Sequence, residues 1–180
     1  MEFLKTHLDG LLVIESRVFE DARGFFFESF NQKRFDELVP NTQFVQDNHS
    51  KSNKGVLRGL HYQIQHAQGK LVRVVQGSVF DVAVDIRKSS TTFGQWFGIE
   101  LSGDNKQQLW IPAGFAHGFL TLEDNTELLY KTTDFYHPDF ERSLLWNDSE
   151  IGISWPSNFE VKLSAKDQVA STLKNAEVYL

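Results

Sequence analysis

Short apolar runs separated by turn-forming residues are the main pattern along this chain. Apolar and aromatic residues group over roughly four to eight positions, the length typical of strands. The segments between them are rich in residues that favour turns, as in Gly103-Asp104-Asn105 and Glu123-Asp124-Asn125. The pattern therefore predicts a series of strands rather than helices.

The segments predicted to be extended are 11–14, 17–19, 25–30, 44–50, 56–63, 71–76, 79–86, 96–101, 108–111, 118–122, 127–133 and 143–146. Residues 31–39 are the one stretch with helical spacing: Asn31 can cap the start, Phe35 and Leu38 fall on one side, and Pro40 ends it. Many short strands with so little helix indicate an all-β fold, a sandwich or barrel of the jelly-roll type.

The composition is that of one folded unit. The chain has 180 residues, of which 41% are hydrophobic, and no linker-like or repeated segment divides it, so we expect a single domain over residues 1–180. Sixteen phenylalanines favour β structure, because aromatic side chains fit a pleated, half-buried surface.

Charge and cysteine content exclude several classes of function. A net charge of −6 without runs of Lys or Arg argues against binding of duplex nucleic acid. With no cysteine, disulfides, thiolate metal sites and thiol catalysis are excluded. The N-terminus lacks the pattern of a signal peptide, and no apolar run approaches the roughly 18 residues of a membrane span, so we expect a cytoplasmic protein without membrane contact.

Two segments resemble the cupin motifs. Pro112-Ala-Gly-Phe-Ala-His117 has the Pro-x-Gly-x-x-His spacing of the second cupin motif. In metal-binding cupins this histidine joins a His-x-His pair and a glutamate, whereas here the pair reads His61-Tyr62-Gln63 and no glutamate follows at the expected distance. Two imidazoles and an amide are a poor ligand set for a transition metal. The sequence thus predicts a cupin scaffold without a metal cofactor.

His61 has two interpretations. It is either a core histidine bonded to the backbone, the commoner case for a single histidine, or a catalytic base oriented by a carboxylate. Asp167, in Leu163-Ser-Ala-Lys-Asp167, is a candidate partner that would fix the tautomer of the imidazole. The sequence does not fix whether the two residues touch.

Six segments together resemble the dTDP-4-dehydrorhamnose 3,5-epimerase family over nearly the whole chain. They occur in the order of the family: residues 21–28, 44–50, 58–63, 112–119, 130–133 and 163–167.

The resemblance implies a cofactor-free cupin homodimer that inverts C3 and C5 of dTDP-4-dehydro-6-deoxy-D-glucose, giving dTDP-4-dehydro-L-rhamnose on the route to dTDP-L-rhamnose. It implies His61 as the base assisted by Asp167, Tyr130 as the acid on the opposite face, and Lys70 as the donor to the enolate oxygen. The positions implied in substrate binding are Arg23, Glu28, Gln46, Asn48, Arg58, His117, Glu141 and Lys166. Phe19, Phe26 and Tyr136 are candidates for stacking on the base, and the apolar edge Phe25 to Phe27 gives a physical motive for dimerisation.

These roles conflict with strict strand alternation, which sends Arg58 and His61 to opposite faces. We therefore predict a β-bulge at Gly59 that turns both side chains to the same side.

Three other functions fit parts of the sequence. A mono-epimerase or ketoisomerase of a deoxysugar-nucleotide pathway would share the scaffold, although Tyr130 favours epimerisation. A metal-dependent cupin enzyme is disfavoured by the missing second histidine. A sugar-binding jelly roll without catalysis would have no turnover to lose when His61 is replaced.

Overall fold

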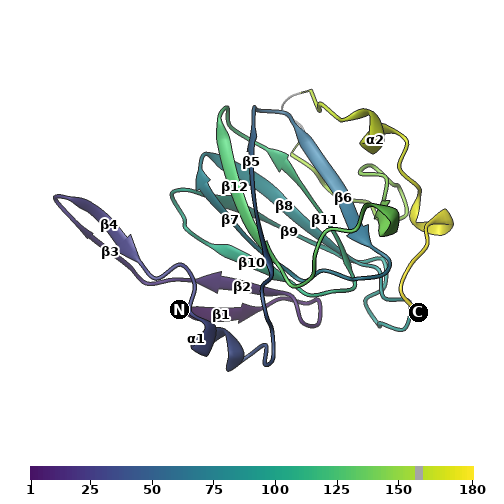
Figure 1. Cartoon of the computed structure of the whole chain (residues 1–180). Helices are drawn as coiled ribbons and strands as arrows, with labels where there is room; N and C mark the ends of the chain where they lie inside the picture. Colours follow the sequence, from purple (N-terminus) through teal and green to yellow (C-terminus); the bar gives the residue numbers. More distant parts are fainter. Residues whose placement is uncertain (157–159) are drawn as a thin grey trace.

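The chain, described by a computed structural model over residues 1–156 and 160–180, forms two antiparallel β-sheets packed face to face (Figure 1). The larger sheet has six strands in the order β1 (Glu2–Lys5), β2 (Leu12–Glu15), β10 (Gln108–Ile111), β7 (Lys70–Gln76), β12 (Thr126–Thr132) and β5 (Gln46–Ser52). The smaller sheet has five, in the order β13 (Glu141–Ser143), β6 (Leu57–Gln63), β11 (Phe115–Thr121), β8 (Ser78–Asp85) and β9 (Trp96–Ser102). The expectation of an all-β, cupin-type jelly roll is confirmed.

A third, two-stranded sheet consists of β3 (Val18–Asp21) and β4 (Gly24–Phe27), and this hairpin projects from the body of the molecule (Figure 1). The helical elements are short: α1 (Gln32–Asp36), α2 (Ala165–Gln168) and two 3-10 turns, η1 (Pro138–Phe140) and η2 (Leu173–Asn175). Within the described residues, no helix is long and apolar enough to cross a membrane.

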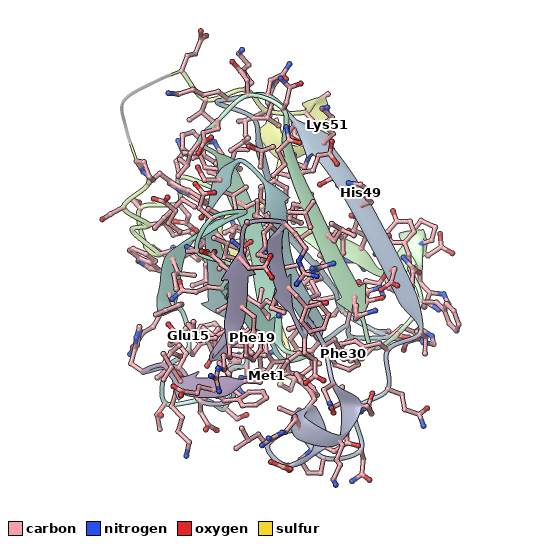
Figure 2. All side chains as sticks on the ribbon, turned by 90° about the vertical axis from the view of Figure 1, so that its left-hand side faces the viewer. Met1, Glu15, Phe19, Phe30, His49 and Lys51 are labelled. Carbon is pink, nitrogen blue, oxygen red and sulfur yellow. The ribbon has the colours of Figure 1, made fainter. Side chains whose placement is uncertain are left out.

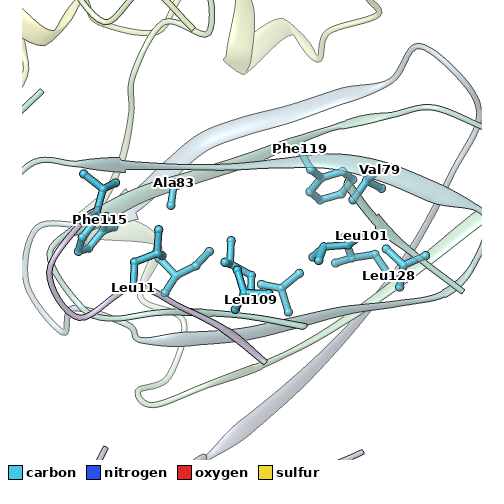
Figure 3. Packing of buried hydrophobic residues seen from close by; sticks show 13 residues of the cluster. Leu11, Val79, Ala83, Leu101, Leu109, Phe115, Phe119 and Leu128 are labelled. Atoms are coloured by element: carbon cyan, nitrogen blue, oxygen red, sulfur yellow. The ribbon is translucent and has the colours of Figure 1, made fainter. Parts of the chain in front are cut away.

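The core lies between the two sheets, as alternation predicts. Phe115 and Phe119 of β11 and Ala83 of β8 face Leu11 and Leu109 of the opposite layer (Figure 3). These side chains are at most 5% exposed. The inward positions of the strands therefore hold the sheets together by removing apolar surface from water.

Both sheets are also covered on part of their outer faces. Phe35 of α1 packs on Trp110 and Leu71 behind the six-stranded sheet. The C-terminal segment, including Tyr179, covers Tyr62 of β6 behind the five-stranded sheet (Figure 1). This double burial explains why several strands have apolar residues on both faces.

Most predicted segments correspond to strands with shifted ends, but the segment 143–146 meets β13 only at Ser143, and β1 was not predicted. Asn31 caps α1, accepting a hydrogen bond from the backbone N–H of Arg34 at 3.2 Å, as expected. The expectation for Leu38 is wrong: α1 ends at Asp36, and Leu38 is 47% exposed while Phe35 is buried. β4 ends at Phe27, since its partner β3 begins at the paired residue Val18.

The predicted bulge in β6 is present. His61 pairs with His117 and Arg58 pairs with Phe119, so three steps along β6 match two along β11. Gly59 has φ of +125°, in the region that favours glycine, and a Cβ there would lie 2.5 Å from Cα of Gly118. Arg58 and His61 consequently line the same cavity.

We expect Gly59→Ala to lower the free energy of unfolding by about 2–5 kcal/mol, from strain at positive φ and from the contact with β11. Gly24→Ala is the matched control, because Gly24 has φ of +122° but nothing within 4 Å of its added Cβ. Gly24→Ala should lower the free energy of unfolding by no more than about 1–2 kcal/mol. Urea unfolding of both variants measures the difference, and equal costs would contradict a steric role for Gly59.

Candidate active site

A cavity of about 540 Å³ opens between the two sheets. β6, β11 and β13 of the five-stranded sheet form one wall, and β7 and β12 of the six-stranded sheet form the other. Residues 162–167, leading into α2, close one side. Eight of the predicted site residues line it: Arg58, His61, Lys70, His117, Tyr130, Glu141, Lys166 and Asp167.

His61 and Asp167 form a hydrogen-bonded pair, although they are 106 positions apart in the chain. Nε2 of His61 lies 2.6 Å from Oδ1 of Asp167, and Ser164, the N-cap of α2, donates its hydroxyl to Oδ2 at 2.8 Å. Burial would raise the pKa of Asp167, but the hydrogen bonds from His61 and Ser164 outweigh it and lower this pKa. The ionised carboxylate favours the tautomer in which Nε2–H of His61 donates to it, and in that tautomer Nδ1 carries the lone pair.

Lys70 is a buried cation beside this pair. It is 8% exposed at the start of β7, and Nζ donates to the backbone oxygen of His61 at 3.3 Å. Burial lowers its pKa to about 8, while the charges of Asp81 and Glu141 act in the opposite direction. The ammonium is therefore held in a poorly solvated wall, where its field on a bound oxyanion is strong.

Tyr130 enters the cavity from the other sheet. Alternation along β12 directs it inward with Leu128 and Thr132, and it packs against the edge of the core. Burial raises the pKa of its phenol, opposed by the charge of Arg58. The phenol therefore keeps its proton at neutral pH and can act as an acid.

Glu141, Lys166 and Tyr136 form a linked group at the cavity wall. Nζ of Lys166 lies 2.5 Å from Oε1 of Glu141, and the hydroxyl of Tyr136 donates to Oε2 at 2.8 Å. Burial would raise the pKa of Glu141, but these hydrogen bonds lower it overall. Glu141 is thus held as an anion, and its two contacts hold Lys166 and Tyr136 at the cavity wall.

The side chains at the two cupin-motif positions, His117 and Gln63, contact other groups of the protein. Nε2 of His117 lies 2.9 Å from Oδ1 of Asp81, a completely buried carboxylate on β8. The side chain of Gln63 is likewise used: its amide bonds to the backbone of His66, Phe135 and His137. Gln63 therefore connects the loop after β6 to the loop after β12.

The remaining binding positions divide into two groups. Gln46 and Asn48 do not line this cavity, but Gln46 donates to Asn48 at 3.0 Å and accepts from the backbone N–H of Tyr136, which does. Arg23 and Glu28 lie outside the cavity: Arg23 is on the projecting hairpin, paired with Asp21 at 2.5 Å, and Glu28 follows β4. The single chain does not bring these two residues to the site.

Residues that sequence reasoning did not select also belong to the site. Asp81 fixes His117, Ser164 fixes Asp167, and Gln63, Gln68 and Phe119 line the wall. The available signal was an acid inside a largely apolar strand, because a buried carboxylate needs a partner, but Asp81 shares this signal with Asp85.

A base with an ionised partner, a buried cation and a phenol on the opposite wall suit one class of chemistry. They can remove a proton from carbon beside a carbonyl, stabilise the resulting enolate, and return a proton to the other face. The forked cation Arg58, held by Ser52 at 3.1 Å, adds a group suited to phosphate.

Known proteins resemble this chain over most of its length. Residues 5–175 match the sequence model of a family described as dTDP-4-dehydrorhamnose 3,5-epimerase. A dTDP-4-dehydrorhamnose 3,5-epimerase of Salmonella typhimurium is 59% identical over 178 residues, covering 98% of this chain and 97% of the relative.

Solved structures agree with this similarity. A dTDP-6-deoxy-D-glucose-3,5-epimerase from Legionella pneumophila, in complex with dTDP-4-keto-L-rhamnose, has a TM-score of 0.95 and 53% identity over 98% of this chain and 94% of that one. Identity falls to 32%, with a TM-score of 0.89, for a 3'-monoepimerase from Streptomyces bikiniensis in complex with dTDP-quinovose, covering 94% and 86%.

Proposed function

The chain belongs to the dTDP-4-dehydrorhamnose 3,5-epimerase family, and from this membership we propose how its own residues carry out the reaction. It is an isomerase that acts on dTDP-4-dehydro-6-deoxy-D-glucose and produces dTDP-4-dehydro-L-rhamnose. The observation that carries the mechanism is the His61–Asp167 pair in a cavity with Tyr130 on the opposite wall.

In the proposed reaction, Nδ1 of His61 takes the proton from a carbon beside the C4 ketone. The electrons of the C–H bond form the C=C bond of an enolate, whose negative oxygen is stabilised by the ammonium of Lys70. Tyr130 then donates its proton to the opposite face of the carbon, and the ketone re-forms. The cycle is repeated at the second carbon, and solvent restores the protonation of both residues.

Three features support these assignments. Base and acid stand on different sheets, so they face opposite sides of a sugar ring held between them. Asp167 is ionised, as a partner that must stabilise a charged imidazole should be. Arg58 lines the same cavity, close enough to Tyr130 for its charge to act on the phenol, and its forked guanidinium suits a diphosphate.

Solvent isotope exchange tests this function. Incubation with the substrate in D₂O should incorporate deuterium at both C3 and C5, with inversion at each, and without any added metal. Label at C3 alone would indicate a mono-epimerase, and movement of the ketone would indicate a ketoisomerase.

The pH profile should report the state of Lys70. Its pKa of about 8 means that the stabilising ammonium is lost as the pH rises through 8, so we expect kcat to fall there. The effect on stability has the opposite sign. Folding lowers the pKa of Lys70 from 10.5 to about 8, so between these pH values the unfolded chain binds the proton more tightly than the folded chain. Raising the pH from 8 to 10.5 therefore favours folding through this group. A falling rate with an undiminished Tm would therefore exclude unfolding as the cause of the fall. Lys70→Met should have a low rate without this alkaline fall, and a fall that persists in this variant would contradict the assignment.

We further propose that the protein is a homodimer in which the β3–β4 hairpin of one subunit reaches the cavity of the other. Phe25 and Phe26 on this hairpin are 59% and 72% exposed, an apolar surface that favours contact with a partner. Arg23 and Glu28 can serve substrate binding only in this way, because they are remote from the cavity of their own chain.

Mixing two variants tests whether the hairpin of one subunit serves the cavity of the other. Arg23→Ala and His61→Asn subunits should each be impaired, but a heterodimer has one cavity with an intact His61 that receives Arg23 from the other subunit. We expect activity to rise when the two are unfolded and refolded together. An unchanged rate, with heterodimers shown by mass spectrometry, would mean that Arg23 acts within its own chain or not at all.

A further inference from the structure

His66, Asp134 and His137 form a cluster of metal-ligand type outside the cavity. Their potential ligand atoms all lie within 4.8 Å of one another, and Nδ1 of His66 is 3.4 Å from Oδ2 of Asp134. The two imidazole rings are stacked, with centroids 4.0 Å apart. None of the three residues lines the cavity that contains His61.

The backbone around this cluster is fixed by the buried side chain of Gln63. Its amide nitrogen donates to the backbone oxygen of His66 at 2.7 Å, and its amide oxygen accepts the backbone N–H of His137 at 2.7 Å. Gln68 holds the backbone oxygen of Asp134 at 2.9 Å. The two loops that carry the cluster are therefore positioned before any ligand arrives, which reduces the entropic cost of binding.

The carboxylate of Asp134 is oriented by the same loop. Oδ1 accepts the backbone N–H of Phe135 at 2.7 Å, which leaves Oδ2 directed at His66. The side chains of His66 and Asp134 are 46% and 35% exposed, so an ion can enter and a water molecule can complete its coordination.

We propose that His66, Asp134 and His137 bind one zinc ion. Two imidazoles and one carboxylate, with water in the fourth position, are a common ligand set for Zn²⁺, with ligand atoms about 2.0–2.2 Å from the metal. The three ligand atoms, now within 4.8 Å of one another, would move closer by side-chain rotation when the ion binds. Ca²⁺ and Mg²⁺ are excluded as the preferred ions, because they favour oxygen ligands.

The bound zinc links the loop after β6 to the loop after β12. The second loop also carries Tyr136, whose hydroxyl donates to Glu141 in the cavity wall. Zinc thus stabilises one rim of the cavity without contacting the reacting groups. The zinc site contains none of the residues of the proposed catalytic mechanism.

Isothermal titration of the intact protein with ZnCl₂ tests the site. We expect one zinc ion to bind per chain. His66→Ala and His137→Ala should each lower the zinc affinity by at least about 10–100-fold, because losing even a residue that only hydrogen-bonds to a metal ligand costs that much. His49→Ala is the matched control. His49 on β5 also has a carboxylate neighbour, Glu127 at 3.0 Å, but among the residues that the structure describes it belongs to no group of three potential ligands. The zinc affinity of His49→Ala should therefore equal that of the wild type.

Thermal unfolding provides a second measurement. Zinc should raise the Tm of the wild type and of His49→Ala, because an ion that binds only the folded state stabilises that state. It should leave the Tm of His66→Ala unchanged, because this variant lacks one of the zinc ligands. Undiminished zinc affinity in the His66→Ala/His137→Ala double variant would overturn the proposal and assign the ion to another histidine. Absence of binding to the wild type at micromolar zinc would also overturn it.

Discussion

Replacing His61 with asparagine should reduce kcat by about 10²–10⁴-fold, the usual contribution of a positioned general base. Asparagine retains a polar side chain of similar reach, so substrate affinity should remain close to that of the wild type. The hydrogen bond with Asp167 is lost or weakened, and no group remains to accept the α-proton. Steady-state kinetics and direct titration of a dTDP-sugar separate the two effects.

His49→Asn is the control for this prediction. His49 lies on the outward face of β5, beside Lys51 (Figure 2), and it also contacts a carboxylate, Glu127. The two histidines thus differ in location rather than in chemistry. If His61→Asn kept its rate, or if it lost affinity in proportion to kcat, His61 would be a binding residue rather than the base.

Replacing Tyr130 with phenylalanine should give a different result, because only the acid is removed. His61 can still take a proton and return it to the same face after exchange with solvent. We expect deuterium to enter the substrate from D₂O while inversion falls by about 10²–10⁴-fold. NMR of the recovered sugar nucleotide measures label and configuration in one sample.

Tyr179→Phe controls for the loss of a buried tyrosine hydroxyl. Tyr179 donates to the backbone oxygen of Gln63 from behind β6, outside the cavity. Its replacement should cost about 1 kcal/mol of stability and leave inversion intact. Inversion at the normal rate in Tyr130→Phe would require another donor on that wall, such as a water molecule.

Local patterns predicted most of the strands, because alternation and turn residues depend on near neighbours. The bulge at Gly59 was also predictable, since Arg58 and His61 could share one cavity only if alternation were broken between them. Resemblance supplied what local patterns lack, namely the pairing of His61 with Asp167 across the chain.

Other features depended on contacts between distant segments that no local pattern encodes. The pairing of Asp81 with His117 follows from the alignment of β8 with β11. Gln63 was recognised only as a missing ligand, whereas its actual contacts are with loops on either side of it. The position of the β3–β4 hairpin could not be inferred either, because the residues of a projecting hairpin have few partners in their own chain.

The separation of the two sheets has a consequence for how this enzyme tolerates substitution. His61 and Tyr130 belong to opposite layers, and the gap between them is set by the apolar side chains that fill the sandwich, among them Leu101 and Leu128 (Figure 3). Face-to-face sheets pack about 10 Å apart, and a change in core volume alters that spacing. Core residues outside the cavity therefore influence the distance over which a proton is delivered, so a substitution there can change stability and stereochemical outcome together.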